Sequence, residues 1–175
     1  MGDVKVRKAA LVDAPAIARV HVASWKSTYA GILPEEFLAS LAVDDREKMW
    51  SQVLGQDNGR THVLVAELER FGVVGFAALG PERAGDEEYD SELSAIYILE
   101  EHQRRGAGQL LFRAGVNALA EDGYNSMLLW VLSQNPACRF YEAMGGVPVR
   151  SRTISVGGQT YEEIGYGWRD GMPVA

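Results

Sequence analysis

The spacing of apolar residues divides the chain into a helical first third and a strand-rich remainder. In the first third, apolar positions recur every three or four residues, which is the period of an amphipathic helix. Asp13 and Asp44 stand where two of these segments begin and are expected to be N-caps. The pattern predicts a first strand at residues 4–11 and helices at residues 14–26, 35–41 and 44–54.

From residue 61 onward the apolar period shortens, and β-branched residues become frequent, as is typical of strands. Strands are expected at residues 61–68, 72–79, 92–99, 126–132, 147–156 and 160–168, and helices at residues 105–122 and 136–144. The run 126–132 (SMLLWVL) is apolar almost throughout, which indicates a central strand buried on both faces. Gly157 and Gly158 are a hairpin turn signal. This order predicts a mixed sheet flanked by helices, an α/β or α+β fold, in a single domain over residues 1–175.

Composition supports a globular domain and argues against several classes of protein. The chain has 175 residues, of which 47% are hydrophobic and 23% are charged, as in ordinary globular proteins. Its net charge of −7 argues against nucleic-acid binding, which needs a basic face. Cys138 is the only cysteine, so neither an internal disulfide nor a cysteine cluster for a metal is expected. Without a signal peptide or an apolar run of ~20 residues, the chain is expected to be cytoplasmic and not to contact a membrane.

The acidic balance is confined to one segment. Eight acids and one base, Arg83, lie between Glu82 and Glu101, so this segment alone carries the net charge of −7. One interpretation is a solvated loop. The other is an electrostatic funnel for a cationic substrate, to which Asp86, Glu87 and Glu88 would contribute.

The clearest chemical signal is a glycine-rich turn between a strand and a helix, Gln103-Arg104-Arg105-Gly106-Ala107-Gly108. The free backbone N–H groups at a helix N-terminus and the helix dipole favour a phosphate there, and the two arginines add positive charge. The run lacks the Lys-Ser/Thr pair of a Walker A loop and the third glycine of a Rossmann fingerprint.

Instead, Gln103-x-x-Gly106-x-Gly108 resembles the Gln/Arg-x-x-Gly-x-Gly/Ala turn of the GCN5-related N-acetyltransferase (GNAT) family. The resemblance extends to residues 21–34, to the strand 92–99 (ELSAIYIL) and to residues 135–146, which begin with Asn135. The chain departs from the family at Glu100, where proline is common, and at Cys138, where arginine or alanine is common. The resemblance implies a central, mostly antiparallel sheet of six to seven strands, about four flanking helices, and a V-shaped opening between two central parallel strands.

The resemblance also implies an acyl-CoA N-acyltransferase (EC 2.3.1.-). Such an enzyme moves an acetyl group from acetyl-CoA to a primary amine, by direct attack in a ternary complex. No metal is expected, because the three histidines are scattered. The turn amides would hold the pyrophosphate, the strand backbone would pair with the pantetheine arm, and an N–H near Ile98 would polarise the thioester carbonyl. The implied cofactor-binding residues are Ile96, Tyr97, Ile98, Gln103, Arg104, Arg105, Gly106, Ala107, Gly108, Gln109 and Asn135.

The implied catalytic residues are Tyr141 and Glu92. Tyr141 would protonate the departing thiolate, with a packing role beside Phe140 as the alternative. Glu92 opens the strand and is the best candidate to deprotonate the amine, whose pKa near ~10.4 leaves little free base at neutral pH. An ordinary solvated strand end is an alternative role for Glu92, and deprotonation by solvent is an alternative to it. Trp25 and Tyr29 are candidates for the acceptor pocket, with core packing equally expected for Trp25.

Two other functions stay open, together with the acceptor and the oligomeric state. The protein could be a non-catalytic acyl-CoA-binding or sensing module on the same fold, or a dinucleotide-binding oxidoreductase. The acceptor could be a small-molecule or a peptide amine. The family includes many homodimers, and the sequence does not decide between a monomer and a dimer.

Overall fold

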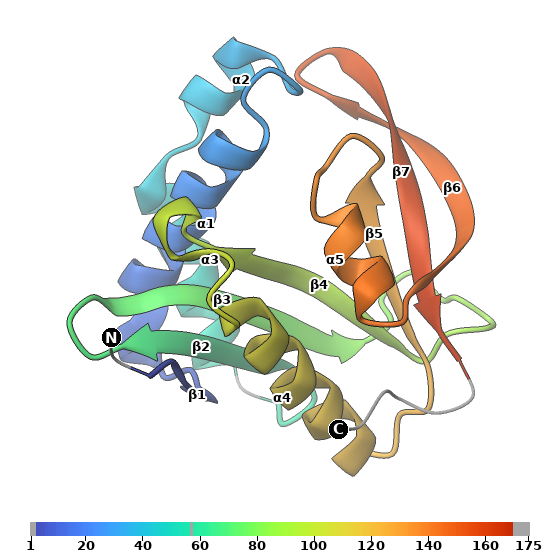
Figure 1. Ribbon diagram of the computed structural model, residues 1–175, viewed down its shortest axis with the longest axis horizontal. Helices are drawn as coiled ribbons and strands as arrows, with labels where there is room; N and C mark the ends of the chain where they lie inside the picture. The colour runs from blue at the N-terminus through green and yellow to red at the C-terminus, as the bar shows by residue number, and fades with distance from the viewer. Residues whose placement is uncertain (1–2, 57, 170–175) are drawn as a thin grey trace.

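The computed structural model describes residues 3–56 and 58–169, and its strands form one seven-stranded sheet in the order β1-β2-β3-β4-β5-β7-β6 (Figure 1). The strands are β1 (Lys5–Lys8), β2 (His62–Leu68), β3 (Gly72–Pro81), β4 (Ser91–Ile98), β5 (Met127–Leu132), β6 (Val147–Val156) and β7 (Gln159–Trp168). All neighbouring pairs are antiparallel except β4 and β5, which are parallel. The predicted mixed, mostly antiparallel sheet is confirmed.

Helices cover both faces of this sheet. They are α1 (Ala14–Thr28), α2 (Glu35–Ser40), α3 (Val43–Gly55), α4 (Ala107–Glu121) and α5 (Cys138–Ala143), with short 3-10 turns η1 (Leu11–Asp13) and η2 (Glu100–His102). Ile17 and Phe76 belong to the core under α1 and α3, whereas Phe112 and Met127 belong to the core under α4. Since helices cover both faces, side chains on both faces of a central strand are buried. Each apolar side chain buried in this way stabilises the fold by about 1.5–3 kcal/mol, which favours apolar residues on both faces. This explains the continuous apolar run predicted for β5.

The two predicted N-caps differ in outcome. Asp13 does precede α1, but its carboxylate accepts hydrogen bonds from Arg7, at 2.8 and 2.9 Å, and from the Ala10 N–H, at 2.7 Å. The hydrogen bonds from Arg7 hold the pKa of Asp13 below its usual range. The predicted N-cap role of Asp44 was wrong, because α3 begins at Val43. Asp44 lies in the first turn of α3, where a carboxylate interacts favourably with the positive end of the helix dipole.

The parallel pair opens into a V. β4 and β5 are paired only at Ser91 with Met127 and at Glu92 with Leu128, and the strands then diverge (Figure 1). A bulge at Ser94, between the pairs Ala78–Ala95 and Leu79–Leu93, interrupts the register of β4 with β3 near the point of divergence. Bulges bend the strand that carries them. The predicted V-shaped opening between two central parallel strands is confirmed.

The hairpin of β6 and β7 closes the wide end of the V against α2. Its turn contains Gly157 and Gly158, both at positive φ, as the sequence predicted. A Cβ atom at Gly157 would lie 3.0 Å from the Phe37 Cβ and 3.1 Å from the Pro34 Cγ, so the hairpin tip touches the start of α2. Tyr29, at the end of α1, is buried in the small core beneath this contact.

Candidate active site

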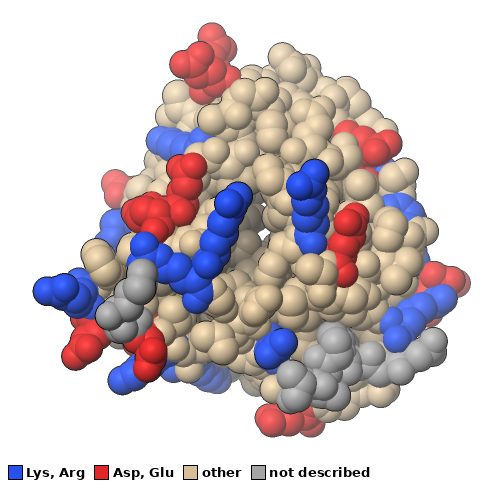
Figure 2. All heavy atoms as spheres, in the orientation of Figure 1, with Lys and Arg blue, Asp and Glu red and all other residues tan. Residues whose placement is uncertain are grey.

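A cavity of about 710 Å³ occupies the V-shaped opening, and Figure 2 shows this face of the molecule hollowed at its centre. This volume is typical of small-molecule sites. Its walls come from α1, from β4 with the turn that follows it, and from α5 with the loop before it. The predicted site residues that line it are Ile96, Tyr97, Ile98, Gln103, Arg104, Gly106, Ala107, Gly108, Gln109, Asn135 and Tyr141. The predicted residues outside the lining are Trp25, Tyr29, Glu92 and Arg105.

The edge of β4 that faces the cavity can accept an extended ligand. The N–H of Leu99 bonds to the carbonyl of Val74 in β3 at 2.9 Å, so by alternation the polar groups of Ile96 and Ile98 point away from β3 into the opening. Among the described residues, β4 has no strand partner on this side beyond Glu92. The Gln103 side chain donates to the Ile98 carbonyl at 3.1 Å, which holds the phosphate turn against this edge.

The phosphate turn, Gln103–Gly108, owes its shape to two residues in the left-handed region. Gly106 has φ +84° and precedes α4, whereas Arg104 has φ +60° without being glycine. A side chain in this region costs about 1–2 kcal/mol, and such strain tends to occur at ligand sites. Alternation of left- and right-handed residues turns successive backbone N–H groups toward one concavity, which suits an anion. The turn can therefore bind a phosphate with its backbone.

Tyr141 is only 5% exposed and lines the cavity from α5. Burial raises the pKa of its phenol well above the ordinary value. The hydroxyl therefore keeps its proton throughout the neutral range and can act as a proton donor.

Asn135 organises the loop before α5. Its Nδ2 donates to the Tyr29 hydroxyl at 3.1 Å, and its Oδ1 accepts from the Ala137 N–H at 2.8 Å. Tyr29 is 5% exposed and packs in the core with Leu33 and Leu38. The Trp25 ring lies 4.8 Å from the Tyr29 ring. Neither aromatic residue lines the cavity, contrary to the expectation. Tyr29 supports Asn135 from the core, and Trp25 packs against Tyr29.

Glu92 lies at the apex of the V, where β4 and β5 separate. Its carboxylate is 15% exposed and receives two hydrogen bonds from Arg83, at 3.1 and 3.2 Å. Arg83 itself is 72% exposed. Glu92 is therefore close to the strand divergence but outside the cavity lining, with a partner that can leave toward solvent.

The loop at the start of the acidic segment, residues 82–90, is organised by ion pairs and hydrogen bonds, whereas Glu100 near the end of the segment lines the cavity. Asp86 and Glu88 pair with Arg150 of β6 at 2.5 and 2.8 Å. The Glu82 carboxylate accepts the backbone N–H groups of Ala84 and Asp86, at 2.8 and 2.7 Å. None of these loop acids lines the cavity. The structure therefore favours an anchored loop over the electrostatic funnel.

The α1 wall of the cavity was not foreseen from the sequence. It consists of Ser24, Ser27 and Thr28, which share one helix face because they are three and four positions apart. Ser24 is 1% exposed, and its hydroxyl has no hydrogen-bond partner among the described residues. The signal was a stripe of small hydroxyl residues at the end of a mostly apolar helix.

His21, also on α1, supports the site from behind. Its ring stacks on Tyr97 at 5.4 Å, and its Nδ1 accepts a hydrogen bond from the Trp50 indole N–H at 3.1 Å. Burial lowers the pKa of His21 to about 4.

We expect this histidine to make stability depend on pH. Between pH ~6.5 and pH 4, His21 binds a proton in the unfolded chain but not in the folded chain. Its contribution to the free energy of unfolding is therefore fully present above pH ~6.5 and is lost as pH falls toward 4. The expected loss of unfolding free energy between pH 7 and pH 5 is about 2 kcal/mol, measured by urea denaturation. His21→Gln, whose amide oxygen can still accept from Trp50, should lose much less. An equal loss in both proteins would contradict the assignment.

The fold and this site together define the class of CoA-dependent acyltransferases, and comparisons with known proteins narrow it. Residues 85–154 match the family described as FR47-like protein. The chain is 42% identical to YuaI of Bacillus subtilis, an uncharacterized N-acetyltransferase, over 95% of this chain and 94% of that protein. It is 27% identical to phosphinothricin N-acetyltransferase of Streptomyces viridochromogenes, over 95% and 87% of the two chains. The PaiA N-acetyltransferase of Thermoplasma acidophilum, solved in complex with coenzyme A, superposes with a TM-score of 0.68 at 22% identity, over 93% and 98% of the two chains.

The chain belongs to the GCN5-related N-acetyltransferase family, and the predicted family, fold and enzyme class are confirmed. Within residues 3–56 and 58–169, no cluster of three or more His, Cys, Asp or Glu side chains is placed to hold a metal ion. No helix in this part of the chain has the length and apolar character needed to cross a bilayer.

Proposed function

We propose that this N-acetyltransferase moves the acetyl group of acetyl-CoA to a primary amine by direct attack in a ternary complex. One observation carries the proposal: a single cavity brings together the phosphate turn, the open edge of β4 and the buried phenol of Tyr141. The turn would bind the pyrophosphate, and Ile96 and Ile98 would pair with the pantetheine arm as an added strand would.

Acetyl-CoA supplies a thioester, whose carbonyl carbon the amine attacks. An N–H near Ile98 is proposed to stabilise the negative charge that develops on the carbonyl oxygen, and such a donor lowers the barrier by about 3 kcal/mol. Tyr141 is proposed to donate its proton to the sulfur as the carbon–sulfur bond breaks. The ammonium form of the substrate loses one proton before the attack. The nitrogen loses a second proton as the amide forms, and this proton passes through water to restore the Tyr141 phenol, so one proton is released overall. The products are the N-acetylated amine and free CoA.

Glu92 is proposed to take the first proton through water. Its position at the apex of the V supports this role. About four residues of strand, ~13 Å, separate it from Ile96, so a relay is needed. The exposure of Arg83 leaves the Glu92 carboxylate free to act once the pair opens.

Glu92→Gln tests this role through its pH profile. We expect kcat/KM for the amine to fall about ten-fold at pH 7, and the loss to shrink as pH rises toward the amine pKa of ~10.4, where free amine is abundant. Arg83→Gln, which removes only the partner, should keep most activity. A loss for Glu92→Gln that is the same at every pH would assign Glu92 a structural role.

A thiol-release assay with acetyl-CoA and a panel of amines tests the proposed function itself. CoA release that requires an amine, with the N-acetyl product seen by mass spectrometry, is the expected result. CoA binding by calorimetry without turnover on any amine would favour a non-catalytic sensing module. Thermal stabilisation by NAD and not by CoA would favour the oxidoreductase.

Several finer assignments stay predictions. The relative from Streptomyces is named for phosphinothricin, which is compatible with a small-molecule acceptor here, whereas a peptide amine remains open. We keep residues 1–175 as one domain, because the described strands form one sheet. The cytoplasmic location also stays a prediction, and monomer and homodimer both stay open.

A further inference from the structure

Three arginines on the phosphate turn and on α5 make no ion pair or side-chain hydrogen bond within residues 3–56 and 58–169. Arg104 and Arg105 belong to the phosphate turn, and Arg139 is on α5. Arg83 and Arg150, in contrast, each pair with carboxylates elsewhere on the surface. In a protein with a net charge of −7, free cations gathered at one opening indicate an anionic ligand there.

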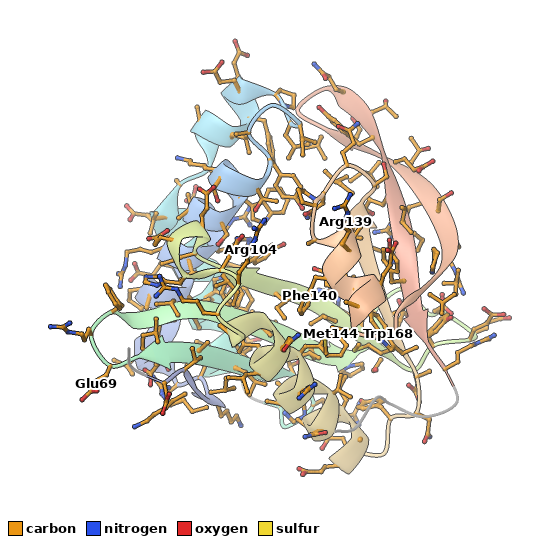
Figure 3. All side chains as sticks on the ribbon, viewed as in Figure 1. Glu69, Arg104, Arg139, Phe140, Met144 and Trp168 are labelled. Carbon is orange, nitrogen blue, oxygen red and sulfur yellow. The ribbon has the colours of Figure 1, made fainter. Side chains whose placement is uncertain are left out.

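Two of these arginines face each other across the opening. In Figure 3, Arg104 lies in the loop after β4 and Arg139 lies on α5, on opposite sides of the gap between these elements. The central hollow of Figure 2 has basic side chains on both sides. Because the loop after β4 and α5 form two walls of the cavity, a ligand that enters between them passes between the two guanidinium groups.

Packing holds α5 next to the phosphate turn. A Cβ atom at Gly108 would lie 3.5 Å from the Phe140 ring, so the first turn of α4 touches the residue that follows Arg139. The Phe140 ring is fixed in turn by an edge contact with Phe112 of α4, at 6.2 Å between centroids. Figure 3 shows Phe140 between the two helices. The backbone of Arg139 is therefore held beside the phosphate turn.

The chemistry of CoA suggests what Arg139 meets. With the pyrophosphate in the turn, the adenosine end and its 3′-phosphate lie outside, at the mouth. A phosphate monoester carries about −1.5 to −2 charges at pH 7, and a guanidinium can bind it through two parallel hydrogen bonds. We propose that Arg139 binds the 3′-phosphate of acetyl-CoA and so makes the enzyme prefer CoA thioesters to donors without this phosphate. The inference rests on the proposed use of acetyl-CoA.

The position of Arg139 on α5, outside the turn that would bind the pyrophosphate, is the reason for assigning the 3′-phosphate to it and not to Arg104 or Arg105. Arg104 lines the cavity on the same turn whose N–H groups face the pyrophosphate. Arg139 is outside the cavity lining, on α5, across the opening from Arg104. Removal of Arg104 should therefore weaken the binding of every acyl donor that carries a pyrophosphate. Removal of Arg139 should weaken the binding only of donors that also carry the 3′-phosphate.

Kinetics with acetyl-CoA and with 3′-dephospho-acetyl-CoA test the inference. The unaltered enzyme should prefer acetyl-CoA about ten-fold in kcat/KM, and high salt should reduce this preference. Arg139→Ala should abolish the preference by raising the KM for acetyl-CoA about ten-fold, with kcat and the KM for the dephospho donor unchanged. Arg113→Ala, which removes an exposed arginine from α4, should behave as the unaltered enzyme.

Two outcomes would overturn the inference while leaving the proposed function standing. In one, Arg139→Ala keeps the ten-fold preference. In the other, Arg139→Ala raises the KM for acetyl-CoA and for the dephospho donor by the same factor. If the unaltered protein neither binds nor turns over either donor, the proposed function fails and this inference fails with it.

Discussion

Replacing Tyr141 with phenylalanine should lower kcat about 100-fold or more while the Kd for CoA changes less than about three-fold. The phenol is buried in the cavity and burial keeps it protonated, so it is available to donate when the thiolate departs. General acids contribute about 10²–10⁴ to rate when positioned in this way. The ring stays, so the packing against Phe140, with centroids 5.5 Å apart, is retained. Steady-state kinetics and calorimetry with CoA separate the two effects.

Tyr166→Phe is the matched control. Its ring lies 6.0 Å from that of Tyr141 in the same core, and its hydroxyl donates to Glu142 at 2.8 Å rather than facing the cavity. This variant should lose about 1 kcal/mol of stability from the broken hydrogen bond and keep its turnover. If Tyr141→Phe also kept full turnover, another group or water would be the acid.

The second large effect concerns the backbone of the phosphate turn. Gly106→Val should raise the Kd for CoA about 100-fold, because a β-branched residue cannot hold φ +84° without strain and the turn must then reposition its N–H groups. Loss of one or two hydrogen bonds to a charged group is enough for this change, since 100-fold corresponds to about 2.7 kcal/mol. Calorimetry with CoA measures the Kd, and thermal unfolding measures the cost in stability.

Gly123 provides a control at the other end of the same helix. It follows α4 and has φ +91°, and a Cβ atom there, as at Gly106, would meet no other atom within 4 Å. Gly123→Val should lower the melting temperature about as much as Gly106→Val and leave the Kd for CoA unchanged. A Gly106→Val protein that binds CoA normally would show that the backbone of the turn does not hold the phosphates.

Much of the site could be predicted from the sequence, because its signals are local. The turn from Gln103 to Gly108 is recognisable from its glycine spacing beside a strand, and Tyr141 from its place in a short helix motif. The structure brings both into one cavity, although 30 or more positions of sequence separate them. The catalytic roles of Tyr141 and Glu92 stay predictions, which the variants above would test.

Other parts of the site could not be predicted, because they depend on which side chains meet once the chain has folded. Asn135 was expected to face CoA, but its side chain also holds Tyr29, 106 positions earlier. The sequence did not indicate that Glu92 pairs with Arg83, across the β3–β4 connection. Arg139 is one arginine among many in the sequence, and only the placement of α5 across from the phosphate turn distinguishes it.

The sequence by itself determined the elements, their order and the phosphate turn, since hydrophobic period and glycine conformation act over a few residues. The tertiary structure alone decided which of these residues share the cavity. Ser24 reaches it because α1 packs beside β4, and Asp86 and Glu88 do not, because Arg150 holds them against β6. The physical reason is that burial and ion pairing depend on distances between side chains in the folded protein. Only the packing of the sheet and its helices sets these distances.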